Sequence, residues 1–241
     1  MSIARKTRSW GRVWLACAVL LALPWPALAE TIALIGTGNV GGALGRRFAE
    51  SGHTVVYGSR DPLAADVVAL VNTTGHGAVA LSPDQAAARS RVVVLAIPWS
   101  ATEDVVRGLG DLSGKIIVDP TNPRVMASDG FADYPPTLED SNAERIARLA
   151  PGAQVVKAFS TLGAETMLDP SLAEGPVTIP LVGDDRAAKA LVGEFAREIG
   201  LEAADVGPLR HARIVEGLHY LRANALGGRI NYYLRRDTAR D

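Results

Sequence analysis

The chain has 241 residues, a formal net charge of −1 and a single cysteine, Cys17. This length suits one sizeable α/β domain. No Lys/Arg-rich stripe follows the first residues, so nucleic-acid binding is not expected, and one cysteine excludes an internal disulfide or a cysteine-rich metal site. The four histidines, His53, His76, His211 and His219, are too scattered to form a ligand motif, and we expect no metal.

The first 29 residues have the layout of a secretory signal. Four basic side chains precede or begin an apolar run over residues 13–23, and Ala27, Leu28 and Ala29 form a small-residue cleavage site before Glu30. The run is shorter than the about 20 residues that a membrane span needs. We expect cleavage after Ala29 and export, most simply to a bacterial periplasm. An uncleaved membrane anchor or a cytoplasmic location is the alternative.

Removal of residues 1–29 takes away those four basic side chains and no acidic one, which changes the formal net charge from −1 to −5. The mature chain, residues 30–241, is therefore mildly acidic and has no membrane segment that the sequence would predict.

Residues 31–61 predict a strand, a loop, a helix and a second strand that together bind a dinucleotide. Gly36, Gly38 and Gly41 fit G-x-G-x-x-G between the first strand and the helix. Gly36 permits a tight turn, Gly38 leaves room for a pyrophosphate, and Gly41 lets helix and strand approach closely. The helix N-terminus offers free N–H groups to the anion. The motif alone is weak, but this context favours a bound dinucleotide over a purely structural loop.

The second strand ends in Gly58, Ser59 and Arg60. An NAD-specific site usually has an acidic residue here, on the ribose 2′-hydroxyl. A guanidinium pairs bidentately with phosphate and a serine hydroxyl can donate to it, so this pair favours NADP over NAD. The alternative is a solvated arginine that opens a loop, and the neighbouring Asp61 is the residue that argues against a 2′-phosphate site.

The rest of the chain alternates strands and helices. This alternation predicts an α/β fold, a Rossmann-type doubly wound and mostly parallel sheet with a small α/β C-terminal extension. Ser82 and Pro83 predict a helix start, and Ser100 with Glu103 predicts a capping box. Residues 124–140 predict a long polar loop of the kind that forms lids or binding loops. The expected strands cover 32–35, 54–57, 78–80, 91–97, 115–118, 154–159, 177–181 and 202–206. The expected helices follow the glycine-rich loop and Ser82 and cover 62–71, 100–109, 141–149, 184–199 and the chain from about 210 onward.

Five motifs carry a resemblance to a known family. They are IGTGNVGGAL from Ile35, GSRD from Gly58, LAIPWSA from Leu95, SNAERIARLAPGAQVVKAFST from Ser141, and VGDD followed by DVGPLRHARIVEGL. Together they resemble the NADP oxidoreductase family typified by coenzyme F420-dependent NADP reductase. Its relatives include the cytosolic reductase domain of the six-transmembrane epithelial antigen metalloreductases. The resemblance covers nearly the whole mature chain.

The resemblance implies a small single-domain reductase over residues 30–241 that passes hydride between NADP(H) and a flavin or deazaflavin, which would be FMN, FAD or F420. It also implies roles for individual residues, which are grouped by the part of the cofactor they would contact. Thr37, Gly38, Asn39 and Val40 would hold the pyrophosphate, Ser59 and Arg60 the 2′-phosphate, Ile97, Pro98 and Trp99 the adenosine side or nicotinamide ribose, Thr121 and Asn122 the nicotinamide edge, and the turn from Ser160 to Ala164 the second ring system.

The chain departs from the family pattern in two places. Pro62, Leu63 and Ala64 stand where family members can carry a lysine, which weakens the implied grip on the 2′-phosphate. The segment after Asp119 matches the metalloreductase pattern about as well as the deazaflavin one, so the acceptor stays open. A secretory signal is unusual for either group, because NADPH is normally a cytoplasmic cofactor.

We assign no catalytic side chain, because hydride can pass directly between two rings held in contact. Lys157 and His211 are the candidates for a proton donor, and they are weighed against a solvent-facing strand lysine and a helix-capping histidine. We expect Tyr220, Tyr232 and Tyr233 to pack in the protein and not to stack on a flavin.

Two other functions remain open. One is a non-catalytic NADP-binding sensor or partner module that kept the nucleotide cradle. The other is a two-substrate dehydrogenase such as an imine or 3-hydroxyacid reductase, although such folds generally add a long helical domain and few residues follow Pro208. The expected partner is a small-molecule electron acceptor. The apolar positions Ile214, Leu218 and Leu221 favour a homodimer through the C-terminal helix.

Overall fold

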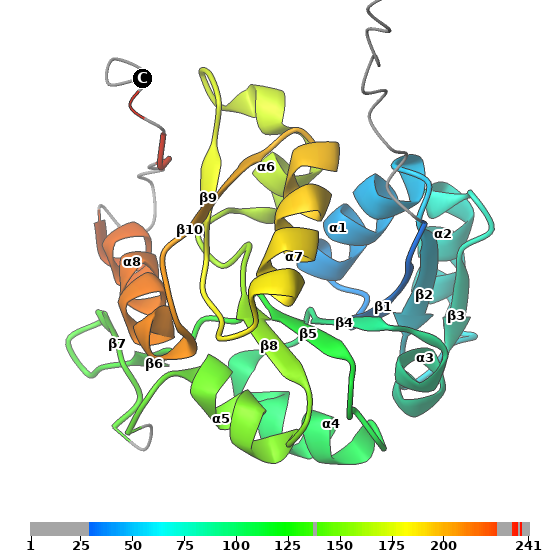
Figure 1. The fold of residues 1–241 in the computed structure, drawn as a ribbon, viewed down its shortest axis with the longest axis horizontal. Coiled ribbons are helices and arrows are strands. Elements are labelled where there is room, and N and C mark those ends of the chain that lie inside the picture. The colour runs from blue at the N-terminus through cyan, green and yellow to red at the C-terminus, as the bar shows by residue number, and fades with distance from the viewer. Residues whose placement is uncertain (1–28, 137–138, 226–232, 236, 238–241) are drawn as a thin grey trace, which may run out of the picture.

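The computed structural model describes residues 29–136, 139–225, 233–235 and 237, so the predicted signal segment lies outside them except for Ala29. Its main sheet consists of six strands: β1 (Thr31–Ile35), β2 (Thr54–Gly58), β3 (Val79–Leu81), β4 (Val92–Leu95), β5 (Ile116–Asp119) and β8 (Gln154–Lys157). All are parallel, in the order β3-β2-β1-β4-β5-β8 (Figure 1). The sheet grows outward in both directions from β1 and β4, which is the predicted doubly wound Rossmann-type arrangement.

Eight helices are described: α1 (Asn39–Glu50), α2 (Ala65–Thr74), α3 (Pro83–Arg89), α4 (Thr102–Gly108), α5 (Asn142–Leu149), α6 (Ala164–Leu168), α7 (Arg186–Glu198) and α8 (Ala212–Asn224). They cover both faces of the sheet, with α1 and α7 on one face and α3, α4 and α5 on the other (Figure 1). The core divides in the same way, because successive strand residues point to opposite faces. Ile32 and Leu34 belong to one hydrophobic cluster, and Ala33 and Ile35 belong to the other.

The C-terminal part forms the predicted small α/β extension. Strands β9 (Thr178–Leu181) and β10 (Glu202–Asp205) pair in parallel as a separate two-stranded sheet, and α7 connects them. An antiparallel bridge between Lys157 and Val182 joins this extension to the edge of the main sheet at β8. Three short 3-10 helices complete this region and the loops: η1 (Trp99–Ala101), η2 (Pro170–Leu172) and η3 (Leu209–His211).

Two predicted helix starts are wrong. The helix expected over 62–71 begins at Ala65, because the Asp61 carboxylate accepts a hydrogen bond from the Leu63 amide and holds a turn there. The capping box expected at Ser100 and Glu103 does not form, since η1 occupies the turn and α4 starts without a side-chain cap. Glu103 binds Arg107 at 2.9 Å instead, and it also pairs with Arg145 on α5.

The long segment predicted as a polar loop is partly ordered as a hairpin. Within it, β6 (Val125–Met126) and β7 (Ala132–Asp133) pair in antiparallel fashion. Asn224 at the end of α8 fixes this hairpin, because its side chain accepts from the Ala132 amide at 2.7 Å and donates to the Ala132 carbonyl at 2.9 Å. The hairpin therefore belongs with α8 and is not a free lid.

Two surface properties bear on the predicted partners. In the described ranges, no helix has both the length and the apolar character to cross a membrane. Ile214 and Leu221 on α8 are 70% and 62% exposed, so both are available for a contact. The homodimer stays a prediction, which a measurement of the molecular mass in solution would check.

Gly45 lies in α1 where this helix passes closest to Tyr57 of β2. A Cβ at Gly45 would lie 2.2 Å from the Tyr57 hydroxyl, which is fixed by a 2.8 Å hydrogen bond to Thr74. Overpacking costs about 1–3 kcal/mol, and the better helix propensity of alanine returns up to about 1 kcal/mol. We therefore expect Gly45→Ala to lower the free energy of unfolding by about 1–2 kcal/mol in urea titrations followed by circular dichroism.

Gly217→Ala is the matched control, because a Cβ at this position in α8 meets no atom within 4 Å. We expect its stability to be unchanged or higher. Equal stabilities for the Gly45 and Gly217 variants would show that α1 and β2 can separate without cost.

Candidate functional site

The glycine-rich turn between β1 and α1 is shaped by two close approaches and one open position. A Cβ at Gly36, where φ is +108°, would lie 2.2 Å from the Ala96 carbonyl oxygen, and a Cβ at Gly41 would lie 2.0 Å from the Gly36 carbonyl oxygen. A Cβ at Gly38 would meet nothing within 4 Å. The first and third glycines are thus required by packing, whereas the second faces free space.

That free space lies at the N-terminus of α1. Gly38 is the N-cap residue, and the first turn of α1 contains no acidic side chain to occupy the helix N–H groups. Unpaired N–H groups and the positive end of the helix dipole favour an anion. The structure therefore provides a cradle that a phosphate group fits, and Thr37, Asn39 and Val40 are the residues beside it.

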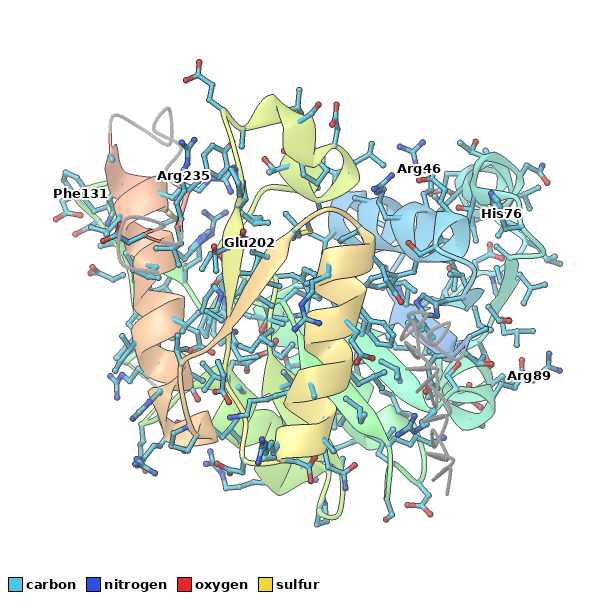
Figure 2. All side chains as sticks on the ribbon, turned by 45° about the horizontal axis from the view of Figure 1, so that its top comes forward. Arg46, His76, Arg89, Phe131, Glu202 and Arg235 are labelled. Atoms are coloured by element: carbon cyan, nitrogen blue, oxygen red, sulfur yellow. The ribbon has the colours of Figure 1, made fainter. Side chains whose placement is uncertain are left out.

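A pocket of about 420 Å³ extends from this cradle toward α6. It brings together Thr37, Gly38, Asn39 and Ala164, all of which the sequence singled out. Its wall also contains Arg46, which projects from α1 (Figure 2). The sequence analysis missed Arg46, although its spacing of four from Gly42 places both residues on the same face of α1.

Arg60, at the carboxyl end of β2, is exposed, and no hydrogen bond or ion pair to it occurs within the described part of the chain. The neighbouring Asp61 does not engage it, because the Asp61 carboxylate accepts from the Leu63 amide at 3.1 Å. The Ser59 hydroxyl bonds to the Asp61 backbone, donating to its carbonyl at 3.1 Å. The guanidinium is thus available to a ligand at the end of β2.

The segment after β4 lies against the glycine-rich turn. Ile97 is half-buried and contacts the position of Gly36, where a Cβ would lie 3.3 Å from its Cγ2. Pro98 leads into η1, and the Trp99 indole N–H donates to the Arg124 carbonyl at 2.9 Å. Trp99 thereby ties the end of β4 to the segment that follows β5.

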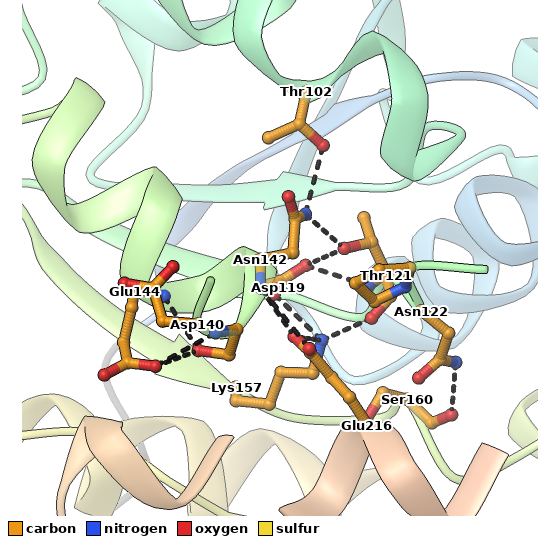
Figure 3. A network of polar contacts seen from close by, with 12 residues as sticks. Thr102, Asp119, Thr121, Asn122, Asp140, Asn142, Glu144, Lys157, Ser160 and Glu216 are labelled. Carbon is orange, nitrogen blue, oxygen red and sulfur yellow. Dashed lines mark hydrogen bonds and ion pairs between the residues drawn. The ribbon is translucent and has the colours of Figure 1, made fainter. Parts of the chain in front are cut away.

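The turn after β5 is held from within the protein. The Asp119 carboxylate accepts from the Thr121 amide at 2.9 Å and from the Thr121 hydroxyl at 2.6 Å. The Thr121 hydroxyl in turn accepts from the Asn142 side chain at 2.7 Å. The amide and hydroxyl of Thr121 are therefore already hydrogen-bonded within the protein, and its side chain is buried in the polar network of Figure 3.

Lys157 lies at the centre of that network and is fully buried (Figure 3). Its ammonium is 2.9 Å from the Asp119 carboxylate and 3.0 Å from that of Glu216 on α8, and it also donates to the Thr121 carbonyl. Glu216 additionally accepts hydrogen bonds from the Tyr134 hydroxyl at 3.0 Å and from the backbone amide of Asn142 at 3.1 Å. Two carboxylates, one ammonium and several neutral donors thus satisfy one another in the interior.

The electrostatics of the cluster keep the lysine charged. Burial by itself lowers the pKa of Lys157, but the carboxylates of Asp119 and Glu216 outweigh it and raise that pKa above its usual value. Burial raises the pKa of Glu216, and the Lys157 ammonium opposes this. Burial also lowers the pKa of His219, one turn further along α8, to about 4, with help from Arg124 and Arg222.

The next residues at this edge present polar atoms without a partner. Asn122 donates to the Ser160 carbonyl at 2.7 Å, which joins the ends of β5 and β8. Asn122 Oδ1, Ser160 Oγ and Thr161 Oγ1 are buried, yet each lacks a hydrogen-bond partner among the described residues. Phe159, which precedes them, has a φ of +63°, a conformation that non-glycine residues rarely adopt and that is concentrated at functional sites. Orphaned buried polar atoms of this kind fit a polar ligand.

Several expectations about single residues are corrected. The solvent-facing reading of Lys157 is wrong, because β8 is covered on both faces and the Asp119 carboxylate lies opposite it in the strand register. His211 occupies the N-cap position of α8 without capping it, and its Nδ1 donates to the Val206 carbonyl at 2.9 Å.

Tyr220 packs in the protein as expected, since its hydroxyl donates to the Pro123 carbonyl and its ring meets that of Tyr134 edge-on. Tyr232 lies outside the described residues.

The Asp119, Lys157 and Glu216 cluster is the part of the site that sequence reasoning missed. A usable signal was present, because a charged residue inside an apolar strand covered on both faces needs a buried partner. The third member, Glu216, lies on a helix 59 positions further along the chain, and no local pattern links it to Lys157.

Comparison with known sequences agrees with the predicted resemblance. The family described as NADP oxidoreductase coenzyme F420-dependent matches residues 31–123. The F420-dependent NADP reductase of Methanothermobacter thermautotrophicus is 35% identical over 207 residues, which cover 80% of this chain and 88% of that protein. The metalloreductase STEAP3 of Rattus norvegicus is 31% identical over 195 residues, which cover 80% of this chain but only 37% of that protein.

Comparison with solved structures gives the same result. A protein from Arthrobacter sp. FB24 described as an F420-dependent NADP reductase superimposes with a TM-score of 0.77 at 31% identity, over 86% of this chain and 100% of that one. The parallel sheet, the glycine cradle and these matches together establish that the chain belongs to the NADP oxidoreductase coenzyme F420-dependent family and is an NADP-dependent oxidoreductase.

Proposed function

We propose that the protein transfers hydride between NADP(H) and a flavin or deazaflavin acceptor of the F420 type. The observation that carries this proposal is the set of unpaired buried atoms on Asn122, Ser160 and Thr161, at the edge of the sheet that continues the glycine cradle. Nicotinamide and flavin-type rings both have amide groups at their edges, and such groups need hydrogen-bond partners of this kind.

Each group of site residues contacts a different part of the cofactor. The cradle at Gly38 receives the pyrophosphate on the free N–H groups of α1. Arg60 receives the 2′-phosphate, whereas the Ser59 hydroxyl, expected to share this role, already donates to the Asp61 carbonyl. Ile97, Pro98 and Trp99 flank the ribose and adenosine side. Asn122 takes the nicotinamide edge, whereas Thr121 is held inside the protein and positions its neighbour.

When bound, NADPH supplies the hydride, so the side chains are left to bind, orient and exclude water. The turn from Ser160 to Ala164 borders the space for the acceptor. The Lys157 ammonium is enclosed by its two carboxylates and does not reach that space as a free proton donor. This arrangement supports a site without a catalytic acid or base.

A non-catalytic NADP-binding module is the second candidate. The absence of an assigned catalytic side chain and the proposed export both favour it. Metal reduction is a weaker candidate, because the match to STEAP3 spans little more than a third of that protein.

We also propose that the chain is exported and cleaved after Ala29. Glu30 supports this, since it is already integrated into the fold. Its carbonyl accepts from the Thr54 amide at 2.9 Å, its backbone nitrogen donates to His53 at 3.1 Å, and its carboxylate pairs with Arg91. A chain that begins at Glu30 keeps all three contacts, with the new amino group as the donor to His53.

The first test is oxidation of NADPH by the purified protein. FMN, FAD, F420 and ferric chelates are offered in turn, and NADH is run in parallel. We expect turnover with a flavin or with F420 and a clear preference for NADPH. Turnover is measured as the loss of absorbance of the reduced nicotinamide. Tight binding of NADPH without turnover on any acceptor would contradict the proposal and favour the binding module.

The second test concerns Arg60. Replacement by alanine removes a charge-assisted contact to the 2′-phosphate, and we expect the Kd for NADPH to rise about tenfold or more while the Kd for NADH stays unchanged. Arg89→Ala is the matched control, because Arg89 is also exposed and lies at the far end of α3 (Figure 2). Equal losses for both dinucleotides would show that Arg60 does not contact the 2′-phosphate.

The third test concerns processing. When the whole chain is expressed in a bacterium, we expect the periplasmic fraction to contain a protein whose intact mass corresponds to residues 30–241. A variant with bulky residues in place of Ala27 and Ala29 should keep its full mass, because the cleavage site needs small residues. A full-length product of the unaltered chain in the cytoplasm would show that the segment is not a cleaved signal.

A further inference from the structure

Thr121 is fixed by three different groups. Asp119 accepts from its amide and hydroxyl, Asn142 donates to its hydroxyl, and the Lys157 ammonium donates to its carbonyl. That carbonyl belongs to the peptide unit that leads directly into Asn122. Its orientation therefore sets the direction in which the Asn122 side chain leaves the backbone.

The Lys157 ammonium is itself held in place by two carboxylates from different layers. Asp119 comes from the adjacent strand β5, and Glu216 comes from α8. Glu216 also accepts hydrogen bonds from the Tyr134 hydroxyl and from the backbone amide of Asn142. Figure 3 shows Glu216 beside Lys157 and Asn142. All three charged side chains are at most 1% exposed, so water does not screen or replace these contacts.

The charged groups of the cluster are used within the protein. Among the described residues, the unpaired atoms at the site are on Asn122, Ser160 and Thr161, and Asn142 of the network also has an unpaired Oδ1, whereas Asp119, Lys157 and Glu216 bond to one another and to their neighbours. The hydrogen bond from Lys157 to the Thr121 carbonyl gives the cluster a direct connection to Asn122.

We propose that Lys157 and Glu216 are positioning residues, which couple α8 to the nicotinamide side of the site by fixing the Thr121 carbonyl and with it Asn122. The inference rests on the proposed function, since it concerns the same site. It makes the C-terminal helix part of the active centre without placing a catalytic residue on it. The adenosine side, at Gly38 and Arg60, is independent of this cluster.

Lys157→Met tests the proposal because it keeps the length of the side chain and removes the donor to Thr121. Since it leaves two buried carboxylates unpaired, the double variant Lys157→Met/Glu216→Gln is made in parallel, which restores the net charge of the cluster and guards against loss of folding. Glu198→Gln is the control. Glu198 also pairs with a buried residue, His53 at 2.7 Å, but beside the start of β1, at the amino edge of the sheet.

The two ligands are NADPH and 2′-phospho-ADP-ribose, which lacks the nicotinamide, and both dissociation constants are measured by calorimetry on the folded proteins. In the Lys157 variants we expect the Kd of NADPH to rise and kcat to fall, each by about tenfold to about a hundredfold, as for other small misplacements of positioning groups. The Kd of 2′-phospho-ADP-ribose should not change. Glu198→Gln should leave all three quantities unchanged.

A merely structural cluster would weaken both ligands equally or affect only the unfolding temperature, and either result would overturn the inference while leaving the proposed function intact. If the unaltered protein bound neither ligand, the proposed function would be wrong and the inference would fall with it.

Discussion

The interior of this protein contains a lysine ammonium that has no access to water, and the carboxyl edge of the sheet is arranged around it. Burial of a charge is tolerated only when close partners replace the lost hydration. Asp119 and Glu216 provide them within 3.0 Å, and loss of one partner from such a pair costs about 3–5 kcal/mol. Since Glu216 lies on α8, this helix cannot leave the sheet without leaving a buried charge unpaired. The same requirement fixes the turn that carries Thr121 and Asn122.

The two halves of the cofactor crevice are built in different ways. On the adenosine side, short-range steric contacts set the shape of the site. Gly36 and Gly41 have no room for a side chain, and Gly38 leaves an open cradle at the helix N-terminus. On the nicotinamide side, contacts between β5, β8, α5 and α8 set the shape of the site. The glycine cradle and Arg60 lie within about 30 consecutive residues, as in a βαβ unit, whereas the nicotinamide side is assembled from segments far apart in the chain.

Two segments with the same Ser-x-x-Glu pattern show what a local sequence pattern can predict and what it cannot. Ser100 and Ser141 are each followed three residues later by glutamate, the pattern of a capping box. At Ser141 the box forms, with Glu144 accepting from the serine amide at 3.0 Å. At Ser100 it does not, because Glu103 is drawn to Arg107 and Arg145 and a 3-10 turn takes the place of the cap. The same pattern thus gives two outcomes, because at Ser100 the α-helix starts one residue later, after Ala101, and Glu103 is not in the position that a capping box needs.

The sequence by itself determined the order of strands and helices, the doubly wound class of sheet, the glycine cradle and the family, because these depend on periodicity and on residues close together in the chain. Only the tertiary structure decided that Lys157 is buried, that Glu216 is its partner, that residues 125–133 form a hairpin against α8, and that Arg46 lines the pocket. The reason is physical: the energy of a buried charge or an orphaned polar atom depends on which distant groups surround it, and no local pattern in the chain contains that information.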